Sequence, residues 1–74
     1  MKRQEFLAIL RANLAGIEEN ELEDIMYDYE EHFIIGLEKN KTEEEISEAL
    51  GNPVQIANAY KADSFIKKAE TNPR

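Results

Sequence analysis

The apolar positions of residues 22–37 recur at steps of three and four, the spacing that places side chains on one face of a helix. This stripe consists of Leu22, Ile25, Met26, Tyr29, Phe33 and Leu37. It predicts a helix over residues 19–38 with one side buried, and we expect the rest of the chain to be organised around it. Gly36, near its end, marks either fraying or close packing against another backbone.

The same helix carries a second apolar face that a small core does not need. Tyr27 and Ile34 lie off the stripe, seven residues apart, among the acidic residues Asp28, Glu30 and Glu31. This face either packs against another helix of the chain or binds a protein partner. In the second case we expect aromatic contact to anchor the partner and the acidic side chains to steer it.

A first helix is predicted over residues 2–15. Glycine tolerates the left-handed backbone that often ends a helix, so Gly16 is expected to stop it. The helix over residues 19–38 takes Asn20 as its N-cap or begins a residue or two earlier. The stripe of the first helix consists of Phe6, Leu7, Leu10 and Leu14.

Two further helices follow a polar connection at residues 38–41. Thr42 and Glu45 have the spacing of a capping box, which starts a short helix. Gly51 ends that helix. Asn52 then caps the next one, whose first position suits Pro53 because no amide donor is needed there. The sequence therefore predicts a sharp corner between these two helices at Leu50, Gly51, Asn52 and Pro53.

These patterns predict an all-α fold, because no stretch alternates as a strand would. We expect a compact bundle of three longer helices and one short helix, forming a single domain over residues 1–66. Residues 67–74 are expected to be a polar, basic tail or linker. The predicted core consists of Phe6, Leu10, Leu14, Ile25, Tyr29, Phe33, Leu50, Ala57 and Tyr60.

The chain has 74 residues and a net charge of −7, and the charge is unevenly distributed. Residues 18–48 hold thirteen acidic residues against two lysines, a balance of −11. Such a surface disfavours direct contact with nucleic acid, which requires concentrated Lys and Arg, and favours a basic protein partner. The sequence has no cysteine and no run of about twenty apolar residues, so it predicts neither a disulfide nor a membrane span.

The residues that could carry chemistry are few. His32 and Asp28 lie four apart on one helix face, but two ligands are too few for a structural zinc site. The acidic residues 43–45 lack the spacing of a calcium loop. We therefore expect no catalytic residue, metal or cofactor, and leave a His32-centred metal or small-ligand sensor as the least favoured alternative.

The order of these features resembles the HAAS domain, the helix-turn-helix-associated α-helical signalling domain of bacterial membrane proteins. The resemblance covers residues 2–66. It rests on the opening Met1–Leu7, the acidic segment Tyr27–Glu31, the capped Thr42–Glu45 and the corner at Leu50–Pro53. The family more often has Asp where Asn52 stands, and either residue can cap a helix.

The resemblance implies a cytoplasmic domain, usually N-terminal to a membrane-embedded remainder, that is associated with basic PadR-like transcriptional regulators. No membrane segment follows in this sequence, so the chain is either an excised domain or a stand-alone member. Lys67, Lys68 and Arg74 suit the cytoplasmic side of a following membrane helix. We expect a non-catalytic domain that binds such a regulator; the alternative is a structural or homo-oligomerisation module, for example a homodimer.

Overall fold

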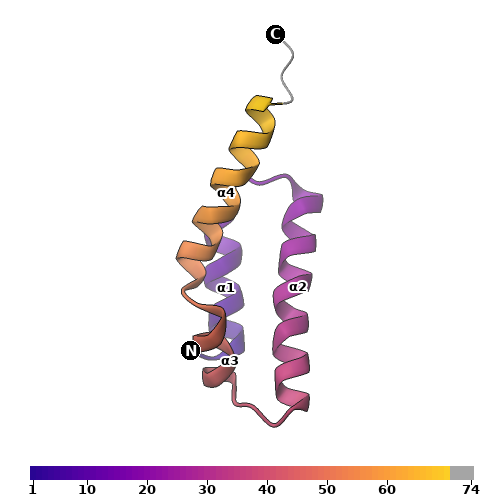
Figure 1. Cartoon of the computed structure of the whole chain (residues 1–74), viewed down its shortest axis with the longest axis vertical. Helices are drawn as coiled ribbons and strands as arrows, with labels where there is room; N and C mark the ends of the chain where they lie inside the picture. The colour runs from indigo at the N-terminus through magenta and orange to yellow at the C-terminus, as the bar shows by residue number, and fades with distance from the viewer. Residues whose placement is uncertain (71–74) are drawn as a thin grey trace.

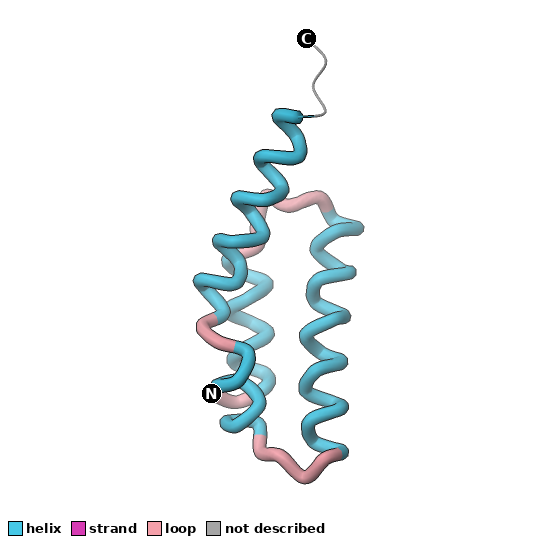
Figure 2. Tube along the Cα trace, viewed as in Figure 1, coloured by secondary structure: helices cyan, strands magenta, loops and turns pink. Residues whose placement is uncertain are grey.

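The computed structural model describes the backbone of residues 1–70 and the side chains of residues 1–63. It contains the helices α1 (Arg3–Asn13), α2 (Glu19–Glu38), α3 (Glu43–Leu50) and α4 (Pro53–Glu70), and no strand within residues 1–70 (Figure 1). The predicted all-α class is confirmed. The two last helices are separated by Gly51 and Asn52 alone, so they can be taken together as one bent helix (Figure 2).

Helix α1, rather than α2, is the element on which the molecule is built. It packs against α2, α3 and α4, whereas α2 packs chiefly against α1 and α3. Three side chains spaced four residues apart on α1 and its C-cap are fully buried: Phe6, Leu10 and Leu14. The expectation that the chain is organised around residues 19–38 is therefore wrong, because the other three helices all pack against α1, a short helix with one deeply buried stripe.

The core lies between α1 and the three helices that surround it. Tyr29, Leu50 and Tyr60 are half-buried and pack against its fully buried members. The predicted core residues therefore all belong to one cluster, and Ile46 of α3 joins them, as its inward-facing position in the sequence indicates. The buried set consists of Phe6, Leu10, Leu14, Ile25, Phe33, Ile46 and Ala57.

Aromatic rings connect three of the helices through this core. Phe6 of α1 meets Phe33 of α2 edge to face, with ring centroids 5.4 Å apart. Tyr29 of α2 meets Tyr60 of α4 in the same manner at 6.4 Å. Such pairs contribute about 0.5–1.5 kcal/mol each beyond the area they bury. The Phe6–Phe33 pair ties α1 to α2, and the Tyr29–Tyr60 pair ties α2 to α4, whose backbones are less closely packed.

The ends of α1 and α2 differ from the sequence-based boundaries. Helix α1 ends at Asn13, two residues earlier than expected, because Leu14 leaves the helical conformation and Gly16 takes a positive φ of 98°. Helix α2 begins at Glu19, and its cap is Glu18, whose carboxylate accepts from the Glu21 amide at 3.3 Å. Asn20 therefore lies inside the first turn.

The C-terminal end of α2 closes in a Schellman motif. The Lys41 amide donates to the Gly36 carbonyl and the Asn40 amide to the Leu37 carbonyl, both at 3.0 Å. Asn40 takes a positive φ of 65°, which asparagine tolerates better than most residues with a side chain. These bonds satisfy carbonyl groups that the last turn would leave free.

The buried stripe of α2 ends on Gly36 and not on Leu37. Leu37 is 38% exposed, whereas Gly36 is buried against Ile46 of α3. A Cβ at Gly36 would lie 2.5 Å from Cδ1 and 2.6 Å from Cγ1 of Ile46. Of the two explanations for Gly36, close packing is correct, although the neighbour is a side chain and not a backbone.

Local capping bonds define both ends of the short helix α3. The Thr42 hydroxyl accepts from the Glu45 amide at 3.1 Å, and the Glu45 carboxylate accepts from the Thr42 amide at 2.9 Å, which confirms the capping box. Gly51 takes a φ of 103° at the C-cap. The Asn52 side chain accepts from the Val54 amide at 2.8 Å, and the buried Pro53 is the first residue of α4.

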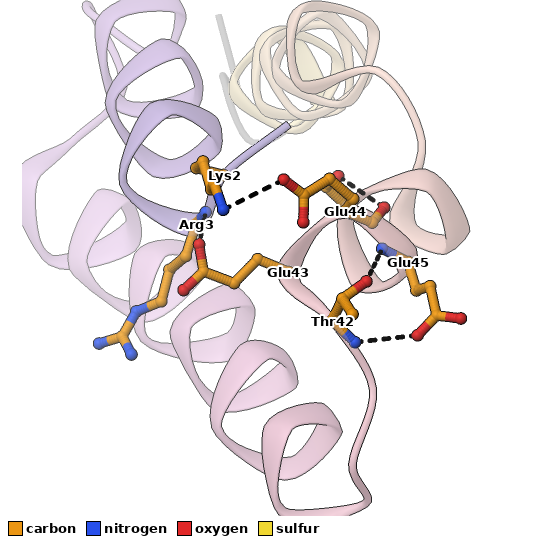
Figure 3. A network of polar contacts seen from close by, with 7 residues as sticks. Lys2, Arg3, Thr42, Glu43, Glu44 and Glu45 are labelled. Carbon is orange, nitrogen blue, oxygen red and sulfur yellow. Dashed lines mark hydrogen bonds and ion pairs between the residues drawn. The ribbon is translucent and has the colours of Figure 1, made fainter.

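Polar contacts join the start of α1 to the start of α3 across forty residues of sequence (Figure 3). The Arg3 amide, which has no helical partner, donates to the Glu43 carboxylate at 2.8 Å. Beside it, the Lys2 ammonium lies 3.3 Å from the Glu44 carboxylate. Glu43 therefore caps α1 from a different helix, since the N-cap residue Lys2 has no side-chain acceptor.

Candidate partner-binding face

The outward side of α2 carries the two residues that the sequence places off its stripe. Tyr27 is 65% exposed and Ile34 is 41% exposed. At about 100° per residue, these two positions lie within about 20° of each other around the helix axis. The described helices therefore leave both side chains accessible to solvent, which argues against the alternative that another helix of the chain covers this face.

The acidic residues of this face do not all belong to it equally. Glu30 and Glu31 lie on either side of Tyr27, within about 60° of it around the helix axis. Asp28 lies about 100° away, toward the flank that carries Tyr29. Of the five predicted residues, the helix brings Tyr27, Glu30, Glu31 and Ile34 together, and it places Asp28 at their margin.

A shallow groove extends this face onto α1, which sequence reasoning missed. It is lined on the α2 side by Glu23, Met26, Tyr27 and Glu30, and on the α1 side by Leu7, Ala8 and Arg11. Leu7 and Met26 are half-buried members of their own stripes. Their position at the stripe edges is the one sequence signal for the groove, because its shape depends on how two distant helices pack.

Burial and charge alter the titration of one residue beneath this face. The pKa of the Tyr29 hydroxyl is raised from 10.0 to about 12, chiefly by burial, then by its hydrogen bond with Tyr60 and by the charge on Asp28. At the start of α3, the pKa of Glu44 is lowered by a backbone hydrogen bond within its own residue and by Lys2.

His32 is exposed, and no group of three or more histidine or acidic side chains within residues 1–63 has the arrangement of a metal site. Its aromatic ring packs beside Tyr29, with ring centroids 5.8 Å apart. None of the helices that the structure describes is both long and apolar enough to cross a membrane.

The residues of the predicted corner, Leu50–Pro53, lie at the junction of α3 and α4. Leu50 is half-buried against the core and Pro53 is buried, whereas Gly51 and Asn52 are exposed. These four residues join α3 to α4, and Gly51, Asn52 and Pro53 also line an open pocket beside Met1 and Glu44. Their role in the structure is conformational.

One comparison with known proteins returns a match. The model of the HAAS family matches residues 5–59, which is about three quarters of the chain. No curated protein and no solved structure matches this chain. The matched range contains the buried stripe of α1, the acidic face of α2, the capping box and the break before Pro53. The chain belongs to the HAAS family.

Proposed function

We propose that this HAAS domain is a non-catalytic signalling domain that binds a basic protein through the outward face of α2. The observation that carries the proposal is the exposure of Tyr27, an aromatic residue that is 65% accessible on a helix whose opposite side forms the core. Aromatic side chains supply much of the contact energy at protein interfaces, while surrounding charges guide association.

The charge around Tyr27 indicates the kind of partner. Glu30 and Glu31 flank it, and Glu23 lines the same groove, whereas Arg11 is the basic residue among the lining side chains. A second copy would bring the same acidic face against itself, which like-charge repulsion opposes. A basic partner is therefore favoured over a homodimer at this face, and the family resemblance supplies the candidate, a PadR-like transcriptional regulator.

We further propose that the domain acts in the cytoplasm, over residues 1–66, as part of a membrane-anchored protein. The side chains of Lys67, Lys68 and Arg74, on which the tail assignment depends, lie outside the described residues. The break at Gly51 and Asn52 would then act as a fixed corner that directs α4 toward the anchor. The positive φ of Gly51 and the cap made by Asn52 support this role.

The test is a kinetic measurement of binding to the regulator encoded beside the gene for this chain. Tyr27→Ala is expected to weaken binding about thirtyfold or more, because truncation of an interface aromatic costs at least about 2 kcal/mol at a hot spot. Val54→Ala is the matched control, since Val54 is an exposed apolar residue on α4, away from α2. Circular dichroism establishes that both variants are folded.

Charge is tested separately. A double reversal, Glu30→Lys with Glu31→Lys, is expected to slow association chiefly, and the effect is expected to shrink as salt rises. Undiminished binding by well-folded Tyr27→Ala and by the double reversal would remove this face from the mechanism. A concentration-dependent dimer that binds no regulator, seen by analytical ultracentrifugation, would favour the structural alternative.

A further inference from the structure

A second groove lies on the other flank of α2, between its C-terminal half and α3. Its apolar lining consists of Ile35, Gly36, Ile46, Ala49 and Leu50. The groove exists because Gly36 has no side chain, which allows Ile46 to lie against the α2 backbone. Ile35, exposed at one edge, lies about 80° around the helix axis from Tyr27 and about 40° from Glu31, so this groove borders the acidic face. It shares no lining residue with the groove beside Tyr27.

The charge at this groove is opposite to that of the surrounding surface. His32, Lys39 and Lys41 complete its lining, and none of its lining residues is acidic. Lys39 and Lys41 are the two lysines of residues 18–48, a segment that holds thirteen acidic residues. Both lysines are exposed and line the groove, so their positive charges lie at its edge.

The size of the groove limits what it can hold. Its volume is about 210 Å³, whereas sites for small organic ligands measure about 300–1,000 Å³. A cavity of about 150 Å³ is enough for a benzene ring. The space therefore suits one large apolar side chain better than a whole metabolite or cofactor.

We propose that this groove binds an acidic segment of a protein partner, which inserts one leucine, isoleucine or phenylalanine side chain between α2 and α3. Carboxylates on either side of that anchor would pair with Lys39 and Lys41. The apolar side chains at the floor of the groove would supply the contact energy, and the two lysines would favour a segment that carries negative charge. The site does not depend on the Tyr27 face, so the domain would present two docking surfaces of opposite charge.

The experiment uses the whole chain, labelled with ¹⁵N, and two synthetic peptides. Each peptide has one leucine, flanked on both sides by glutamates in the first and by lysines in the second. We expect the glutamate peptide to shift the amide signals of Ile35, Gly36 and Ala49, and the lysine peptide to leave them unchanged. A salt concentration of about 0.15 M screens the long-range repulsion between the acidic domain and the glutamate peptide.

Two variants test the two parts of the groove. Lys39→Glu with Lys41→Glu is expected to weaken binding of the glutamate peptide about tenfold or more, whereas Lys61→Glu on α4 should not. Ala49→Phe is expected to block the anchor by filling the groove, and Ala62→Phe is its control. Ala49 and Ala62 are both exposed, so both variants are expected to fold.

Several results would overturn the proposal. Equal binding of both peptides, or of neither, would remove the charge selection on which it rests. Octanoate that shifts the same amides while the glutamate peptide does not would make the occupant a small amphiphile. A dimer that the Lys39→Glu, Lys41→Glu variant abolishes would make it a second copy of the chain.

Discussion

Gly36 lies at the contact between α2 and α3, and its missing side chain sets how near the two helices come. Sequence periodicity continued the buried stripe to Leu37, because leucine carries the apolar signal and glycine carries none. The side chain that occupies the position is Ile46, which belongs to another helix. The spacing of apolar residues within α2 cannot reveal a neighbour that belongs to α3.

Gly36→Ala is expected to destabilise the fold by about 1 kcal/mol. The added methyl group would overlap Ile46, and overpacking costs about 1–3 kcal/mol, while alanine recovers about 1 kcal/mol of helix propensity. The free energy of unfolding, from urea denaturation, is the measurement. The same change is then made in an Ile46→Ala background, with sucrose in all samples so that both the wild type and Ile46→Ala stay folded. In that background Gly36→Ala is expected to stabilise the fold, because the overlapping atoms of Ile46 are gone. Equal effects in both backgrounds would contradict this assignment.

Tyr29 makes the stability of the domain sensitive to alkaline pH. Its pKa is about 12 in the folded state against 10.0 for an ordinary tyrosine, so between these values the unfolded chain releases a proton that the folded chain keeps. Stability is therefore complete below pH 10 and falls as pH rises toward 12. Tyr29→Phe is expected to lose less stability over this range than the wild type in parallel denaturation curves. Identical slopes would show that Tyr29 titrates normally.

At the scale of the helices, signals within a few residues of one another were predictable and contacts between helices were not. Thr42 with Glu45 and Asn52 with Pro53 fix helix ends through neighbours in sequence, and the structure has them as expected. The bond from the Arg3 amide to Glu43 spans forty residues and has no local signature. For the same reason the sequence indicated Tyr27 and Ile34 but not the α1 side of their groove.

Glu43→Ala is expected to destabilise the domain by about 1 kcal/mol, because it removes the only side-chain acceptor seen on the first amide of α1 within the described residues. Glu44→Ala is a close control. It removes an acid from the same first turn of α3 and an exposed ion pair with Lys2, which contributes little. Thermal melts of the two variants should therefore differ, and equal midpoints would mean that Glu43 does not cap α1.

At the scale of the whole molecule, a short chain relies on one helix for most of its long-range packing. The all-α class and the membership of the core were predictable, since each stripe is visible in its own helix. Which helix sits in the middle was not, because that depends on how four stripes meet in space. Leu10, in the middle of α1, is fully buried and belongs to the core that all four helices share.

Leu10→Ala is expected to cost about 2–5 kcal/mol of unfolding free energy, through lost burial and the cavity that remains. For a domain of this size that is a large part of the total. Leu37→Ala removes the same atoms from a partly accessible site, since Leu37 is 38% exposed, and is expected to cost less. Chemical denaturation compares the two, and similar losses would show that α1 does not hold the core.

The contact between α1 and α4 also governs the order in which the domain can form during synthesis. The ribosome releases α1 first, at a time when no other helix is present to bury Phe6, Leu10 and Leu14. Their neighbours Ala57 and Tyr60 are made more than forty residues later. Until α4 emerges, the first helix is an exposed apolar strip of the kind that chaperones and misfolded chains recognise. This domain is therefore expected to fold after, and not during, the translation of its first three helices.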